Sequence, residues 1–231
     1  MTVERLEIRP LTVADAETAA ELKLSVWPKE ASDPKQIRAA VQSPSHQAFL
    51  ALVGDGQNPA GFVSCFLTTS QAGHTRWEID LLAVHPDFRR RGIASKLIET
   101  AVQAGQEAHA SLSRGLIATD NIGSQKSFAS QGFTSDGVVQ TLYICSEPVT
   151  SGIQNKHHAH FVPVSTFLYD GFWLEGLLSP AAFPAAHNHC FESKLNIVGL
   201  LIPETDSINQ AEAKEHGFKP AGTFHWWQRS L

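Results

Sequence analysis

Apolar residues alternate or form short runs at several places in the first hundred residues, a pattern that predicts strands. Leu6 and Ile8 share one face of a strand that stops at Pro10. The stretches AFLALV (48–53) and AGFVSCFLTTS (60–70) flank the turn GDGQNP and therefore predict a hairpin. TRWEIDLLAVHP (75–86) predicts a further strand, and its nearly all-apolar end is typical of a strand buried on both faces of a sheet.

Apolar residues at helical spacing separate these strands. The pair Thr12 and Asp15 predicts the start of a helix that ends before Pro28. Further helices are predicted over residues 34–43 and 93–110. The buried face of the first helix is expected to contain Val13, Ala16, Ala20, Leu24 and Trp27.

A strand, a short helix and a second strand are predicted over residues 114–120, 121–133 and 137–145. The whole order predicts an α+β fold with one strand-to-helix crossover at its centre.

The last part of this pattern recurs later in the chain. Residues 115–144 align without a gap on residues 200–229, and both segments contain Gly-Phe at the end of the short helix. We interpret this as a shortened second copy, with chance similarity between two strand-helix-strand units as the alternative. The polar stretch 147–158 predicts a linker between a first domain, residues 1–146, and a C-terminal lobe, residues 159–231.

Composition excludes several function classes. The net charge of −5 argues against a general nucleic-acid or membrane-surface binder, so we expect no nucleic acid and no membrane among the partners. The N-terminus lacks the pattern of a signal peptide and no long apolar run follows, which predicts a cytoplasmic protein. Three cysteines far apart in the sequence predict buried, reduced thiols.

Two histidine-rich stretches are weak metal candidates. Neither stretch has a second ligand pair at the spacing of a structural zinc site, so we expect no metal. The residues concerned are His157, His158 and His160, and His187, His189 and Cys190.

The stretch RRRGIAS, residues 89–95, carries the clearest candidate chemistry. A strand that runs through a glycine turn directly into a helix leaves backbone N–H groups unpaired at the positive end of the helix dipole. Gly92 lets the backbone approach a phosphate oxygen closely, Ala94 keeps the surface bare, and the three arginines add charge. The alternative is a solvated basic turn. The glycines of a dinucleotide loop and the Gly-Lys-Ser/Thr of a Walker loop are both missing.

At this point the chain resembles the GNAT superfamily of acyl-CoA-dependent N-acyltransferases. The pyrophosphate signature of that family, Arg/Gln-x-x-Gly-x-Gly/Ala after Val-x-Pro, is matched by residues 89–94 after residues 84–86. A second family element is matched in spacing by Asn121, Ser124, Phe128, Gly132 and Phe133. The resemblance covers residues 3–146 well and the remainder only as a degenerate half-copy.

The resemblance implies a fold and a coenzyme site. The fold would be a central mixed, mostly antiparallel sheet flanked by helices, with a smaller C-terminal α+β half. In the family the central strand splays from its neighbour, and the pantetheine arm pairs with its edge. The coenzyme-binding residues would be Leu82, Ala83, Val84, Arg89, Arg90, Arg91, Gly92, Ile93, Ala94, Ser95, Asn121, Ser124 and Phe128.

The candidates for proton transfer are Glu78 and Asp80. They lie two residues apart on the predicted central strand and therefore face one side, which should be the acceptor side of the groove. Either carboxylate is a candidate base, although both could equally form an ordinary polar face paired to Arg76 or Arg114. Phe128 stands where the family has a tyrosine that protonates the leaving thiolate, so the thiolate would leave unaided or take a proton from Tyr143 or water.

The function implied by the resemblance is transfer of the acetyl group of acetyl-CoA to a primary amine, by direct attack in a ternary complex. The acceptor would be a small-molecule or protein amine, and the protein a monomer or homodimer. The alternative is an acyl-CoA-binding sensor or interaction protein that has lost catalysis, which Phe128 and the degenerate repeat favour and which the intact Glu78 and Asp80 oppose.

Overall fold

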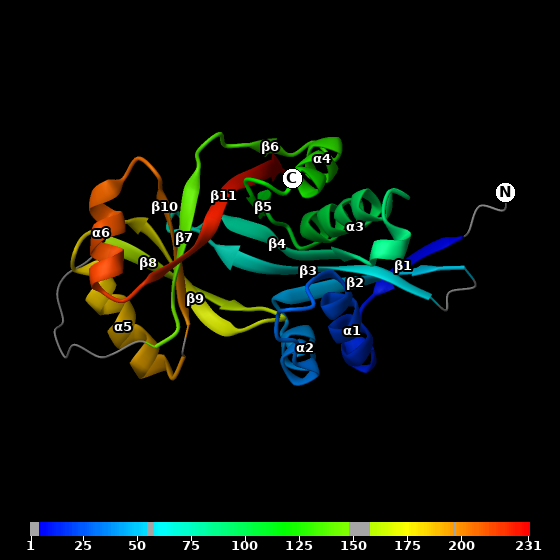
Figure 1. Cartoon of the computed structure of the whole chain (residues 1–231), viewed down its shortest axis with the longest axis horizontal. Coiled ribbons are helices and arrows are strands. Elements are labelled where there is room, and N and C mark those ends of the chain that lie inside the picture. The colour runs from blue at the N-terminus through cyan, green and yellow to red at the C-terminus, as the bar shows by residue number, and fades with distance from the viewer. Residues whose placement is uncertain (1–4, 55–57, 148–157, 196) are drawn as a thin grey trace.

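The computed structural model describes residues 5–54, 58–147, 158–195 and 197–231. These residues form one 11-stranded sheet flanked by helices (Figure 1), as expected for an α+β fold. The strands are β1 (Leu6–Pro10), β2 (His46–Val53), β3 (Asn58–Thr69), β4 (Thr75–Val84), β5 (Leu112–Ala118), β6 (Thr134–Ser135), β7 (Gln140–Cys145), β8 (His158–Ser165), β9 (Asp170–Leu177), β10 (Val198–Pro203) and β11 (Lys219–Ser230). The helices are α1 (Ala16–Val26), α2 (Pro34–Gln42), α3 (Ile93–Glu107), α4 (Ile122–Ser130), α5 (Ala182–Ser193) and α6 (Ser207–Glu215).

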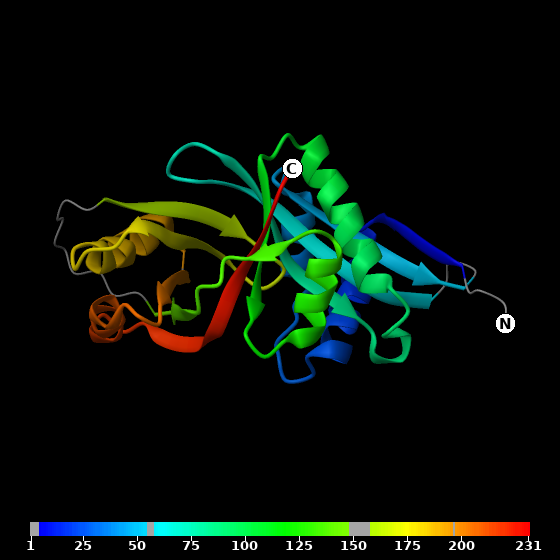
Figure 2. The ribbon, with the colours of Figure 1, turned by 90° about the horizontal axis from the view of Figure 1, so that it is seen from above.

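The sheet is mostly antiparallel, as expected. Its strands run in the order β1-β2-β3-β4-β5-β11-β7-β10-β9-β8, and β6 pairs with β11 beside this path. The pairs β4–β5 and β9–β10 are parallel. At one end of the molecule α3 covers one face of β1–β4 and α1 and α2 cover the other, while α5 and α6 lie at the opposite end (Figures 1 and 2).

The first helix differs in detail from the pattern expected of it. A 3-10 turn, Val13–Asp15, precedes α1, and Val13 and Leu24 are more than a third exposed. The turn changes the helical phase, so the buried face of α1 consists mainly of alanines with Leu22 and Lys23. Lys23 is buried because its ammonium group donates to the carbonyl of Ala31. The expected burial of Val13 and Leu24 was therefore wrong.

The two ends of the molecule exchange strands at the centre of the sheet. β11, the last strand of the chain, lies between β5 and β7, and β7 in turn pairs with β10. All three pairings are antiparallel. The register of β11 with β5 runs from Phe224 opposite Ala118 to Ser230 opposite Leu112. Each part of the chain therefore completes the sheet of the other.

This exchange predicts that the first 147 residues do not form a stable protein alone. A chain that ends after Glu147 would leave the hydrogen-bonding edges of β5 and β7 without β11 and β10, and exposed strand edges promote aggregation. We expect such a truncation to elute as aggregates in size-exclusion chromatography. A soluble monomer with full activity would contradict this role of the C-terminal strands.

Strands β4 and β5 pair only over a short distance. Their parallel register runs from Arg76 opposite Leu112 to Glu78 opposite Arg114, and β4 then continues unpaired on this side to Val84. A bulge accompanies the separation, because Ile79 and Leu81 face consecutive residues of β3 and Asp80 between them is the extra residue. The sheet is thus open beside the second half of β4.

The three cysteines are buried and free, as expected from the sequence. Burial raises the pKa of each thiol, which keeps the sulfur protonated and unreactive.

None of the helices in the described ranges is long and apolar enough to cross a membrane.

Candidate functional site

The turn before α3 has an exposed backbone and carries three arginine side chains. Arg90 and Gly92 adopt positive φ values of 61° and 77°, and α3 begins immediately afterwards at Ile93. A Cβ atom added to Gly92 would have no heavy atom within 4 Å, so the space beside this glycine is open. The first N–H groups of a helix have no intrahelical acceptor, so those at the start of α3 can hold an anion.

Two of the three arginines lie against this turn. Arg89 donates to the carbonyl of Val84 at 3.3 Å, and Arg91 donates to the carbonyl of Asp87 at 3.1 Å. The Arg91 guanidinium also lies 5.2 Å from the centre of the Phe88 ring. All three arginines are exposed, so they can meet the outlying charges of a diphosphate.

The open edge of β4 leads away from this turn. The amide of His85 donates to the carbonyl of Ala60 on β3 at 2.9 Å. Since backbone groups alternate along a strand, the amides of Val84 and Leu82 point to the opposite side, into the gap beside β5. Ala83 is fully buried among the residues that pack against α1 and α2. Leu82 and Val84 are thus the residues of this stretch whose polar groups can pair with an extended ligand.

The second predicted element forms the start of α4. The side-chain oxygen of Asn121 accepts a hydrogen bond from the amide of Ser124 at 3.1 Å and caps this helix. Phe128 is buried, with its ring edge-on to Phe133 at 4.9 Å. A side chain at Gly115 would collide with Phe128 at 2.6 Å, so the glycine makes room for the ring.

A cavity of about 720 Å³ lies between the second half of β4, α4 and the C-terminal strands, and no residue of the arginine-rich turn lines it. Its walls include Asp80 and Leu82 of β4, Leu116 of β5, and Asn121 and Phe128 at α4. The other walls come from β7, β9, β10, β11, the turn before β9 and the end of α1. The structure thus brings the predicted catalytic strand and the predicted second coenzyme element to one space.

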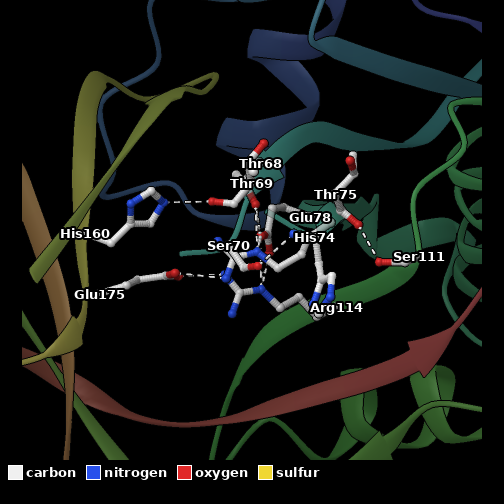
Figure 3. Close-up of polar contacts among 11 residues, drawn as sticks. Thr68, Thr69, Ser70, His74, Thr75, Glu78, Ser111, Arg114, His160 and Glu175 are labelled. Atoms are coloured by element: carbon white, nitrogen blue, oxygen red, sulfur yellow. Dashed lines mark hydrogen bonds and ion pairs between the residues drawn. The ribbon is translucent and has the colours of Figure 1, made fainter. Parts of the chain in front are cut away.

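Glu78 is held in a buried cluster of charges (Figure 3). Its carboxylate accepts hydrogen bonds from Arg114 Nε at 2.8 and 3.0 Å and from the Thr68 hydroxyl at 2.5 Å. Glu175 on β9 accepts from Arg76 and from Arg114, each at 2.8 Å. We call Arg76, Glu78, Arg114 and Glu175 the charge cluster. Its two positive and two negative charges cancel, so Glu78 is fully engaged in ion pairs.

Asp80 has a different environment although it lies only two residues further along β4. Its Oδ2 atom is buried and accepts no hydrogen bond from any residue in the described ranges. Burial, and then the negative charge of Glu78, raise the pKa of Asp80 to about 7. Asp80 is therefore the carboxyl group of this pair that can gain and lose a proton near neutral pH.

Several residues of the cavity were not predicted, because they come from β8–β11. Tyr169 and Trp173 line it, and the Trp173 indole N–H donates to the Tyr169 hydroxyl at 2.9 Å. Trp226 of β11 lies over the Arg114 guanidinium at 3.9 Å. A loose similarity of residues 172–180, FWLEGLLSP, to residues 77–86, WEIDLLAVHP, is a signal in the sequence that could have pointed to Trp173 and Glu175.

Tyr143, the other tyrosine of the chain, lies elsewhere. It is buried among the apolar residues under α5 and α6, and its hydroxyl donates to Gln210 at 3.3 Å. It does not line the cavity, so the structure gives no support to Tyr143 as a proton donor.

The histidine-rich stretches form no metal-ligand cluster in the part of the chain that the structure describes. His157 lies outside that part, as do residues 148–157 of the predicted linker. The His160 ring contacts the carbonyl of Thr69 at 2.9 Å instead (Figure 3).

The charge cluster predicts a stability effect. Replacing Arg114 with alanine would leave Glu78 and Glu175 short of a cation in a buried site, and removal of one partner from a buried ion pair costs about 3 kcal/mol or more. We expect the free energy of unfolding from urea titration to fall by this amount. The control is Arg9→Ala, which breaks a more exposed pair with Asp15 and should cost about 1 kcal/mol or less. Equal losses in the two variants would contradict the importance of the cluster.

Solved structures resemble the chain at low sequence identity, some of them over nearly its whole length. A GCN5-related N-acetyltransferase from Sphaerobacter thermophilus matches with a TM-score of 0.58 and 11% identity, over 97% of this chain and 95% of that chain. A tandem GNAT protein from the clavulanic acid biosynthesis pathway matches with a TM-score of 0.58 and 14% identity, over 98% of each chain. An aminoglycoside N-acetyltransferase in complex with CoA matches with a TM-score of 0.50 and 22% identity, over 57% of this chain and 89% of that chain.

These similarities show a shared fold. No curated protein sequence matches the chain at a significant level. The sequence model of the acetyltransferase (GNAT) family matches residues 13–133, which span β2–β5 and α1–α4 and include both the arginine-rich turn and Asp80. The chain therefore belongs to the acetyltransferase (GNAT) family.

Proposed function

We propose that this protein transfers the acetyl group of acetyl-CoA to a primary amine by direct attack in a ternary complex. The observation that carries the proposal is Asp80, a carboxyl group with a pKa near 7 and no hydrogen-bond partner on Oδ2 among the described residues. It lies in the cavity between Leu82, the start of α4 and the C-terminal strands. A base whose pKa is near the working pH is well suited to take a proton from an amine.

The coenzyme would bind along the turn and the open strand. The amides from Arg90 to Ser95 would hold the pyrophosphate, with charge added by the three exposed arginines. Leu82 and Val84 would pair with the pantetheine arm, and Asn121 would lie near the sulfur. The geometry of Gly92, with its positive φ and open surroundings, supports this assignment.

Asp80 would act as the base, and Glu78 would hold its surroundings in place. In the forward reaction the amine nitrogen attacks the thioester carbon, the C–S bond breaks, and the proton lost by nitrogen passes to the Asp80 carboxylate. Glu78 cannot fill this role as easily, because Arg114 and Thr68 already donate to both of its oxygens. Of the two carboxylates considered from the sequence, the geometry favours Asp80.

Tyr169 is our candidate for stabilising the leaving thiolate in place of a tyrosine at position 128. Its hydroxyl accepts a hydrogen bond from Trp173 and retains its own hydrogen to donate. Burial raises the pKa of Tyr169, and the nearby charge of Asp80 adds to this, so the hydroxyl stays protonated and would act by donating a hydrogen bond to the sulfur. Tyr169 lines the same cavity as Asp80.

Replacement of Tyr169 with phenylalanine tests this role. We expect kcat to fall about tenfold with little change in the KM for acetyl-CoA, less than the hundredfold loss common for a general acid because a thiolate is a good leaving group. Stopped assays of acetyl transfer measure both constants. Tyr143→Phe is the matched control and should leave kcat unchanged, since Tyr143 is outside the cavity. Equal effects in the two variants would remove Tyr169 from the mechanism.

The C-terminal half would be a shortened copy that supports the first domain. We keep the proposed boundaries of 1–146 and 159–231, although the strands of the two parts interleave. In the C-terminal half, α5 begins after Pro180 and Ala181 without a Gly-x-Ala turn or an arginine, so one coenzyme site per chain is expected. Its role would be to form walls of the cavity through β9, β10 and β11.

A sensor that binds acyl-CoA without turnover is the second candidate, favoured by Phe128. Release of free thiol from acetyl-CoA, measured with a panel of primary amines, separates the two. An enzyme releases CoA in an amine-dependent way and yields the acetylated amine by mass spectrometry. Binding of acetyl-CoA without acetylation of any amine in the panel would favour the sensor.

A further inference from the structure

The charges that line the cavity limit which amines it can accept. The charged side chains in its walls are those of Glu30, Glu78, Asp80, Arg114 and Glu175. Glu78 and Glu175 are neutralised within the charge cluster, and Glu30 pairs with the buried ammonium of Lys23 at 2.9 Å. Among the described residues of the wall, this leaves Asp80 as the carboxylate without a cationic partner.

The wall formed by β7, β10 and β11 is mainly apolar and carries one uncharged polar side chain, Gln140. Leu142 and Ile144 alternate along β7, Leu201 lies on β10, and Phe224 and Trp226 alternate along β11, so their side chains share one face of the sheet. Since the coenzyme is expected beside Leu82 and Asn121, this face is left for the acceptor.

We infer that the acceptor is a primary amine with one amino group on an apolar or aromatic body. This rests on the proposed acetyl transfer and narrows its substrate class. The single amino group would lie at Asp80, and the body would bury its surface against Leu142, Ile144 and Phe224. A polyamine or an aminoglycoside would bring further ammonium groups that find no free carboxylate in the described walls.

The energetic penalty for a second ammonium group is large. Burial of a charge without a partner costs several kcal/mol, whereas burial of an added methyl group is favourable. A site of this kind therefore discriminates against an extra charge more strongly than against a change of length.

The direct test compares hexylamine with 1,6-diaminohexane, which have the same chain length and differ by one terminal amino group. With acetyl-CoA saturating, we expect kcat/KM to be at least about tenfold higher for hexylamine, a difference typical of one unfavourable group in a binding pocket. An equal or higher value for the diamine would overturn the inference.

A binding experiment tests the preferred amine even if the protein does not catalyse acetyl transfer. If neither amine is acetylated although acetyl-CoA binds, the same pair is titrated by calorimetry into the protein loaded with CoA. Tighter binding of hexylamine would still support an apolar, singly charged ligand. Tighter binding of the diamine, or no binding of either amine, would overturn it.

A substitution that adds a carboxylate to the apolar wall gives a second test. Leu142→Glu should lower the ratio of kcat/KM for hexylamine to kcat/KM for 1,6-diaminohexane by about tenfold, because the added carboxylate supplies a partner for the second ammonium group. Leu24→Glu is the control, since Leu24 is exposed on α1 and does not line the cavity. An unchanged ratio in a folded Leu142→Glu protein would contradict the placement of the acceptor against β7.

Discussion

Replacing Asp80 with asparagine is expected to lower kcat for acetyl transfer by about 100-fold or more, the usual contribution of a positioned general base. Asparagine has nearly the same shape but cannot accept the amine proton. The affinity for acetyl-CoA should change little, because the proposed coenzyme contacts, at the arginine-rich turn, Leu82 and Asn121, do not include Asp80. Steady-state assays give kcat, and calorimetric titration gives the affinity.

The pH dependence of kcat/KM tests whether Asp80 is the base. The raised pKa of about 7 predicts that kcat/KM of the wild type rises with pH through this value as the carboxylate forms. The same shift affects stability in the opposite direction. A carboxyl group whose pKa is higher in the folded than in the unfolded state stabilises the fold less as pH rises from about 4 to about 7.

Asp80→Asn should therefore be more stable than the wild type at pH 8 and similar to it at pH 4, measured by urea unfolding. A variant that retains more than a tenth of the wild-type kcat, or a pH profile that it shares with the wild type, would remove Asp80 as the base.

Replacing Gly92 with glutamate is expected to weaken the binding of acetyl-CoA by about 100-fold, which corresponds to about 2.7 kcal/mol. Gly92 has a φ of 77°, so a side chain there strains the backbone, and the carboxylate would repel the pyrophosphate. Calorimetric titration with acetyl-CoA and with desulfo-CoA measures the loss.

Gly73→Glu is the matched control. Gly73 has a φ of 83° and open surroundings like those of Gly92, but it lies in the turn between β3 and β4. It carries the same strain and the same added charge away from the proposed cradle. If both variants bind acetyl-CoA alike, the arginine-rich turn is not the pyrophosphate site.

The features that the sequence predicted well depend on neighbouring residues. The glycine turn before α3 and the short helix that begins near Asn121 arise from local backbone geometry, so their residue types reveal them. The bulge at Asp80 interrupts the alternation along β4 and was not predicted, although Glu78 and Asp80 both line the cavity. The predicted end of α3 at Ala110 was three residues late, since the helix ends at Glu107 and Ala108 and His109 form the turn that follows.

The difference between the two carboxylates could not be predicted, because their partners are distant in the sequence. Glu78 is neutralised with the help of Arg114 on β5 and, through it, of Glu175 on β9. The first contact depends on the parallel pairing of β4 with β5, and the second joins residues 61 positions apart, arrangements that no local pattern encodes. The same is true of Tyr169, which lies in the turn after β8, a strand that packs against β3.

Calorimetric titration of the wild-type protein with acetyl-CoA is the direct test of coenzyme binding at the arginine-rich turn. We expect one molecule bound per chain, because the glycine turn occurs before α3 and has no equivalent before α5. Binding should persist in Gly73→Glu and Asp80→Asn and weaken by about 100-fold in Gly92→Glu. An absence of binding at millimolar acetyl-CoA would contradict the proposed coenzyme site and acetyl transfer, since the arginine-rich turn would then be a solvated basic turn.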